Sequence, residues 1–241
     1  MRALRRAVRR IPLPGVIDSV ETGEPLVALT FDDGPDPVWT PLLLELLDRY
    51  QVRATFFMLG SAADRMPALV RRVSEAGHVI GNHTWDHPVL PRTPGRLVRS
   101  QMRHGQGALA PYGSRLFRPP YLAQSPASRL YALLLGYQVI MASVDSGDWW
   151  DPDADRITQR LIGEVSRGDI VLLHDGLSGF SGLKLSKRPV PERVAMLMAL
   201  DGFFQRKGGE FRFVTVPELL RNGRPRRVGK FSKGPTPRPS A

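Results

Sequence analysis

The chain has 241 residues, of which 42% are hydrophobic and 24% are charged, and it contains no cysteine. This length and composition are typical of one globular domain, and they exclude disulfide scaffolds, thiolate metal sites and cysteine nucleophiles. No run of 18 apolar residues occurs in the sequence, which excludes a membrane-spanning helix.

The net charge of +11 is concentrated at the two ends of the chain. Residues 1–10 hold five arginines and residues 221–241 hold seven basic residues, without any acid, whereas residues 11–220 hold 22 basic and 23 acidic residues. The body is therefore nearly neutral, and no specific nucleic-acid partner is predicted. We expect a basic segment at residues 1–22, one domain at 23–220, and a basic, proline- and glycine-rich disordered tail at 221–241.

The first residues lack the apolar stretch of a secretory signal, because residues 11–15 are too short and too rich in proline. The sequence leaves the location of the protein undetermined. The basic ends suit weak contact with an anionic envelope polymer or membrane surface. The chain is expected to act as a monomer.

Seven short apolar runs predict strands, and each is followed by a loop and a helical pattern. In chain order, the runs are residues 26–31, 54–59, 78–81, 116–118, 137–144, 170–173 and 211–214. The helical patterns cover or begin at residues 40–41, 67–76, 93–94, 125–136, 154–165, 191–205 and 217. Thr40 and Ser125 suit the N-cap position of their helices, and Gly77 and Gly136 suit the residue after a helix end.

Strands that alternate with helices predict a parallel sheet, either open and doubly wound or closed into a barrel. Five of the predicted strands are followed at once by ionisable residues. A barrel brings all of these strand ends to one mouth, whereas an open sheet spreads them along an edge. We therefore predict an α/β fold, a distorted (β/α)7 barrel forming a single domain.

The first polar cluster is Asp32-Asp33, which leaves a buried strand and meets a Gly-Pro turn. Alone, this pattern is more often a turn than a site. The second cluster is His83 and His87, four residues apart, a spacing that can present two imidazoles to one ion. An isolated pair of this kind is usually unliganded. With Asp33 it would form a two-histidine, one-carboxylate set that leaves positions open for water and substrate.

Further polar residues follow the later strands. Arg118 precedes two prolines and Tyr121, which fits either a rigid surface loop or an arginine that orients a carboxylate beside an oxyanion-binding N–H. Asp145, Asp148, Trp149 and Trp150 form an acidic, aromatic loop that suits either a covered core edge or sugar binding. His174 ends an apolar run that contains Leu172, and near an ion site it becomes a candidate general acid.

Taken in this order, the motifs at residues 30–36, 83–87, 118–121, 145–149 and 172–174 resemble those of the polysaccharide deacetylases, carbohydrate esterase family 4 or the NodB homology domain. The resemblance covers roughly residues 25–220. The family fold is a distorted barrel of seven strand–helix units. Family members remove acetyl groups from N-acetylglucosamine in chitin, chitooligosaccharides or peptidoglycan, and some cleave O-acetyl esters of xylan.

The resemblance also implies residue roles. Asp33, His83 and His87 would hold a divalent metal ion, usually zinc, and Asp32 and His174 would be the general base and acid. Arg118 would orient Asp32, and Asp148 would hold Arg118. The Tyr121 N–H would bind the oxyanion, while Leu172 and Trp149 would line the acetyl pocket.

We therefore expect a metal-dependent carbohydrate N-deacetylase whose partner is an acetylated carbohydrate. Three alternatives remain open: an O-acetyl esterase with the same site, a polyanion-binding protein that uses its basic ends, and a catalytically silent sugar-binding module.

Overall fold

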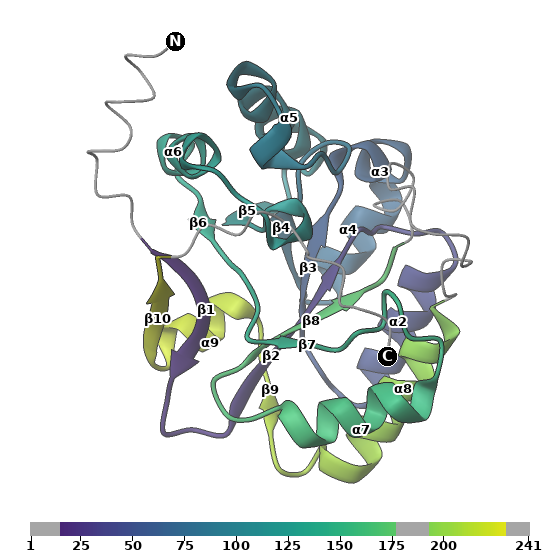
Figure 1. Ribbon diagram of the computed structural model, residues 1–241. Helices are drawn as coiled ribbons and strands as arrows, with labels where there is room; N and C mark the ends of the chain where they lie inside the picture. Colours follow the sequence, from purple (N-terminus) through teal and green to yellow (C-terminus); the bar gives the residue numbers. More distant parts are fainter. Residues whose placement is uncertain (1–14, 177–192, 230–241) are drawn as a thin grey trace.

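In the computed structural model, which describes residues 15–176 and 193–229, helices surround a curled sheet (Figure 1). The strands are β1 (Val16–Glu21), β2 (Leu26–Asp32), β3 (Thr55–Met58), β4 (Val79–Asn82), β5 (Gly113–Phe117), β6 (Gln138–Val139), β7 (Val144–Asp145), β8 (Ile170–His174), β9 (Arg212–Phe213) and β10 (Arg224–Val228). The helices are α2 (Trp39–Arg49), α3 (Gly60–Arg65), α4 (Pro67–Glu75), α5 (Gly95–Ala108), α6 (Pro126–Leu134), α7 (Ala154–Glu164), α8 (Val194–Lys207) and α9 (Val216–Arg221), with 3₁₀ turns η1 (Leu90–Arg92) and η2 (Pro120–Leu122).

The main sheet has the strand order β6-β5-β4-β3-β2-β8-β7, all parallel, and β9 pairs with the start of β2. Its two edge strands, β6 and β7, are only four residues apart in the chain, so residues 140–143 cross from one edge of the sheet to the other. This crossing joins the two edges of the curled sheet without pairing them, and the curled half-barrel confirms the predicted α/β distorted-barrel fold. Because of this crossing, the single strand predicted at residues 137–144 is two short strands, β6 and β7, in the structure.

Residues 140–143 do not continue a regular strand, because the Arg118 side chain donates hydrogen bonds to two of their backbone carbonyls. The Arg118 guanidinium donates to the carbonyl oxygens of Ile140, at 3.4 Å, and Met141, at 2.7 Å. The Met141 N–H donates to the Ile17 carbonyl of β1 at 2.7 Å. These bonds replace those of a regular ladder between neighbouring strands.

Alternation along β2 separates two hydrophobic layers. Val27, Leu29 and Phe31 pack outward against the helices, whereas Leu26 and Ala28 face the barrel interior. The inward series continues through Thr30 to Asp32, which places a carboxylate at the barrel mouth. The core of the fold therefore fixes the side of the sheet on which this carboxylate lies.

The predicted boundaries at residues 23 and 220 are too narrow. Residues 16–21 and 224–228 form the antiparallel pair β1–β10, so the expected disorder is wrong for residues 224–228. Strand β10 was not predicted from the sequence, because it is rich in arginine. Its backbone pairs with β1, and the Arg226 guanidinium makes two 3.0 Å bonds to Asp18. The rest of the predicted basic ends, residues 1–14 and 230–241, lies outside the described residues.

Some helix starts also differ from prediction. Helix α2 begins at Trp39, because Asp36 accepts hydrogen bonds from the Val38 and Trp39 N–H groups at 2.9 and 3.0 Å, so Thr40 is not its cap. Ser125 does cap α6, in a reciprocal pair of bonds with Ser128. Within residues 15–176 and 193–229, every helix is too short or too polar to span a lipid bilayer.

Candidate active site

The polar residues predicted from the motifs converge at the carboxyl end of the barrel. Asp32 and His174 end the adjacent strands β2 and β8 and are direct neighbours in their parallel register. His83 follows β4, Arg118 follows β5 and Asp148 follows β7. All five side chains are buried. The barrel thus brings together groups separated by up to 142 positions in the chain.

Asp33, His83 and His87 form a compact cluster whose donor atoms lie within 4.8 Å of one another. The Asp33 Oδ1 atom lies 3.5 Å from His83 Nε2 and 3.2 Å from His87 Nε2. Among the described residues this buried Oδ1 has no hydrogen-bond partner. A buried, unpaired carboxylate oxygen facing two imidazole nitrogens fits a divalent cation, and this donor set is one that zinc accepts.

The backbone and a neighbouring carbonyl orient these donors. Asp33 and His87 have φ angles of 74° and 62°, in the left-handed region that non-glycine residues rarely adopt. His83 Nδ1 donates to the Arg118 carbonyl at 2.8 Å, so its Nε2 carries the lone pair toward Asp33. Burial, reinforced by the charge of His87, lowers the pKa of His83 to about 3. This imidazole is therefore neutral, as a metal ligand must be.

Asp32 lies beside this cluster without belonging to it. Its Oδ2 is 3.7 Å from His83 Nε2, and its Oδ1 accepts a 2.8 Å hydrogen bond from Arg118. Burial raises the pKa of Asp32, while the positive charges of Arg118 and His174 oppose that rise. The result is a carboxylate held in one orientation at the edge of the cluster.

Arg118 is fully buried among residues of the barrel mouth. It donates to Thr30 and Asp32 at 2.7 and 2.8 Å, in addition to the two carbonyls of the crossing segment, and it lies 4.3 Å from the centre of the Phe57 ring. The predicted contact with Asp32 is therefore present. The predicted contact with Asp148 is wrong, because Asp148 bonds to other residues.

Asp148 holds His174. Its carboxylate accepts from the His174 Nδ1–H and from the His174 backbone N–H, both at 2.9 Å. The Arg193 guanidinium, also buried, donates to the same carboxylate at 3.2 Å. The loop after β7 lies beside β8 and faces α8, which is why Asp148 meets His174 and Arg193 rather than Arg118.

The charges around His174 favour its protonated form. Burial alone lowers the pKa of His174, but the negative charge of Asp148 and the hydrogen bond to it, helped by Asp33 and Asp32, raise it to about 9. For Asp148 itself, burial raises the pKa, and the bonds and charges of His174 and Arg193 outweigh burial and lower it. At neutral pH the pair is an imidazolium beside a carboxylate.

Three further predicted residues border the same region. Tyr121 has a φ angle of 57°, and the edge of its half-buried ring packs against His87 at 4.4 Å between ring centres. Burial raises the pKa of the Tyr121 phenol to about 12, so the ring is neutral. Leu172 pairs with Thr30 two residues before His174 and is buried. Trp149 is half-buried, and its indole N–H donates to Asp145 at 3.4 Å.

Two supporting residues were missed from the sequence. Arg193 stands outside every motif, and nothing near it in the sequence signals its contact with Asp148. Asn82 is buried and bonds to the Met102 carbonyl and the Tyr137 hydroxyl at 2.7 Å, while its oxygen accepts from the Thr84 N–H. A polar residue directly before His83, at the end of an apolar strand, was the available signal for Asn82.

The chain is similar to several known proteins. A family model described as polysaccharide deacetylase matches residues 19–140. A peptidoglycan-N-acetylglucosamine deacetylase of Bacillus cereus is 37% identical over 206 residues, covering 84% of this chain and 91% of that protein. A chitooligosaccharide deacetylase of Sinorhizobium fredii is 39% identical over 173 residues, covering 70% of this chain and 78% of that protein. The crystal structure of the Bc1960 peptidoglycan N-acetylglucosamine deacetylase superposes with a TM-score of 0.76 at 32% identity, covering 88% of this chain and 96% of that one.

Proposed function

The chain belongs to the polysaccharide deacetylase family, and from that premise we propose that it hydrolyses the acetamide of N-acetylglucosamine residues in peptidoglycan-type glycans, using a divalent metal ion. That it is a carbohydrate deacetylase follows from its relatives. Peptidoglycan is the favoured substrate because two relatives that align with more than nine-tenths of their length carry that name. Chitooligosaccharides are the alternative.

The observation that carries the proposal is the placement of Asp32 and His174. They end neighbouring strands beside the Asp33–His83–His87 cluster, one as a carboxylate and one as an imidazolium. Hydrolysis of an amide needs both a base that takes a proton from water and an acid that gives one to the departing nitrogen. The site presents one group of each kind.

We assign the metal to Asp33, His83 and His87, and zinc is the ion that this donor set suits best. When bound, such an ion supplies positive charge that polarises a carbonyl and lowers the pKa of water. Asp32, which Arg118 holds in place, takes a proton from the attacking water while the water oxygen bonds to the acetyl carbon. The Tyr121 N–H then donates to the carbonyl oxygen as negative charge develops there.

His174 completes the reaction. Its Nε2 proton passes to the nitrogen of the sugar as the carbon–nitrogen bond breaks, which releases acetate and a free amine. Leu172 and Trp149 are assigned to the walls around the acetyl methyl group. The strong stabilisation of protonated His174 by Asp148 favours an amide over an ester substrate, since an alkoxide leaving group depends less on a proton donor.

Acetate release tests the proposal. The native chain, supplied with zinc, should release acetate from purified peptidoglycan or from N-acetylglucosamine oligomers, and Asp32→Asn should lower kcat by several orders of magnitude. Asp36→Asn is the control, because that carboxylate caps α2 outside the cluster. Release from acetylated xylan alone would replace the N-deacetylase assignment by an O-esterase. Absence of release from all three substrates, with metal bound, would contradict both.

The oligomeric state and the basic ends are also proposals. We expect a monomer, and we expect residues 1–14 and 230–241 to make weak contact with an anionic envelope polymer or membrane surface through charge alone. Removing residues 1–10 and 230–241 should weaken binding to these anionic partners and leave acetate release unchanged. The second cut spares β10, which pairs with β1.

A further inference from the structure

Positive charge is segregated within the folded body of the chain. Residues 87–144 contain seven arginines and no aspartate, glutamate or lysine. This stretch comprises η1, α5, β5, η2, α6 and β6. Two of its arginines are buried, and the five exposed ones are Arg92, Arg96, Arg99, Arg103 and Arg115. Although the net charge of residues 11–220 is close to zero, residues 87–144 are therefore cationic, and the acidic residues lie on the other elements.

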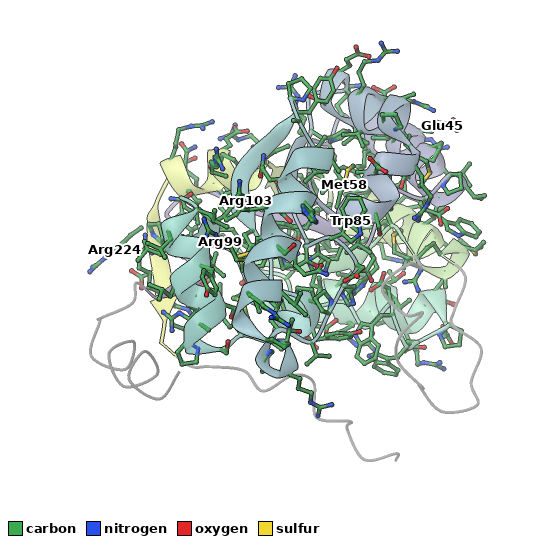
Figure 2. All side chains as sticks on the ribbon, turned by 90° about the horizontal axis from the view of Figure 1, so that it is seen from above. Glu45, Met58, Trp85, Arg99, Arg103 and Arg224 are labelled. Atoms are coloured by element: carbon green, nitrogen blue, oxygen red, sulfur yellow. The ribbon has the colours of Figure 1, made fainter. Side chains whose placement is uncertain are left out.

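Helix α5 presents most of this charge on one side. Arg96, Arg99 and Arg103 are spaced three and four residues apart, whereas Val98 and Met102 between them are buried against the barrel. Figure 2 looks down on this side of the molecule, where Arg99 and Arg103 are labelled on α5. The helix thus carries a stripe of guanidinium groups that points away from the core.

These arginines have no carboxylate partner among residues 15–176 and 193–229, because no acid lies near them in sequence and none reaches them from another element. Some exposed arginines elsewhere in the fold do have such partners. Examples are Arg49 with Asp201, Arg212 with Glu218, and Arg226 with Asp18. The charge of the α5 stripe is consequently uncompensated within the described fold and free to attract an anionic partner.

The two helices of this stretch also carry exposed leucines. Leu97 of α5 is 47% exposed, and Leu133 and Leu134 of α6 are 44% and 70% exposed. The two helices pack against each other, with Tyr131 of α6 beside Gly95 of α5. Leucine adds nothing to the binding of a soluble polyanion, but it enters the boundary between headgroups and acyl chains when a basic surface lies on a bilayer.

We propose that this surface, the α5–α6 face (Arg92, Arg96, Leu97, Arg99, Arg103, Leu133 and Leu134), lies on an anionic phospholipid bilayer. Arginines attract the headgroups, and leucines insert below them. The same segment contributes to the site, since His87 precedes η1 and Tyr121 precedes α6. Binding through this face therefore holds the enzyme at a membrane surface. This role is additional to the proposed deacetylation and does not depend on it.

Co-sedimentation of the full chain with vesicles tests the proposal. The vesicles contain phosphatidylcholine alone or phosphatidylcholine mixed with about 30% phosphatidylglycerol. The native chain should partition onto the mixed vesicles and much less onto the neutral ones. The triple variant R96Q/R99Q/R103Q should bind about fivefold more weakly per arginine removed, on the order of a hundredfold in all. The control R49Q/R206Q/R212Q removes equal charge from elements outside the face and should change binding far less.

The variant L133S/L134S separates a bilayer from a soluble polyanion. It should lose several-fold in vesicle binding yet retain native binding to heparin. The basic ends are present in every variant, so they cannot produce these differences. An arginine triple variant that binds no more weakly than its control would overturn the proposal, and so would a leucine variant with native vesicle binding. All variants should keep native acetate release from soluble oligomers, which makes this test independent of the proposed function.

Discussion

Replacing Asp148 by asparagine tests whether this carboxylate keeps His174 protonated. Asparagine preserves the shape of the side chain, and its oxygen can still accept the Nδ1–H bond that spans 2.9 Å, but the negative charge and the acceptor for the His174 backbone N–H are lost. Without that charge, the burial that lowers the pKa of His174 is opposed only by weaker, more distant carboxylates. The pKa of His174 should therefore fall from about 9 to its ordinary value of 6.5 or below.

The size of the effect follows from the two protonation states. At pH 8 a group with a pKa of about 9 is roughly 90% protonated, whereas one with a pKa of 6.5 is roughly 3% protonated. If protonated His174 supplies the proton to the departing amine, Asp148→Asn should lower the rate at pH 8 on the order of thirtyfold through protonation alone. Part of this loss should be recovered as the pH falls toward 6.

The assay is the pH dependence of kcat/KM for acetate release from an N-acetylglucosamine tetramer. The alkaline limb of the native profile should move to lower pH by about 2.5 units or more in Asp148→Asn. The control is Asp151→Asn, since Asp151 is another buried carboxylate, paired with Arg156 at 2.7 Å, that does not contact His174. A folded Asp148→Asn variant with the native alkaline limb would refute the assignment of Asp148 as the residue that sets the charge of His174.

Three further predictions concern buried ionisable groups. Arg193→Gln should lower the free energy of unfolding by about 1–3 kcal/mol in denaturant titrations, because it removes one of the two buried cationic partners of the Asp148 carboxylate and leaves only His174; an unchanged midpoint would contradict this. Arg118→Lys should lower kcat by about a hundredfold with little change in KM, because one ammonium cannot reach Thr30, Asp32 and two carbonyls together; native kcat would argue against a positioning role. Burial lowers the pKa of His78 to about 4, so the free energy of unfolding should decrease as the pH falls below 6.5, by about 2 kcal/mol at pH 5 relative to pH 8. His78→Gln should remove that part of the pH dependence. Equal pH dependence in both chains would be inconsistent with a neutral, buried His78.

The sequence predicted the site well where residues sit at strand ends. Asp32, Asp33, His83, Arg118 and His174 each follow a buried apolar run, and parallel strands carry such residues to the same mouth. Their convergence therefore depends on local pattern and on a simple topology, both of which a sequence displays. The structure brings all of them together.

The pairing of Asp148 could not be predicted from local pattern. It depends on which strand the loop after β7 leans against, and that is set by the crossing of residues 140–143 between the two sheet edges. Arg193 was missed for a similar reason, because its role follows from the packing of the start of α8 against that loop. Strand β10 was missed because its arginines resemble a solvated tail, while its order comes from backbone pairing with β1.

The central claim is that Asp33, His83 and His87 hold one metal ion beside a separate catalytic carboxylate, Asp32. Calorimetric titration of zinc into the chelator-treated chain tests it most directly. The native chain, Asp32→Asn and a control at a buried histidine outside the cluster, His78→Gln, should each bind one equivalent, whereas Asp33→Ala and His83→Ala should bind none at that site. Full zinc binding by Asp33→Ala and His83→Ala would contradict the account.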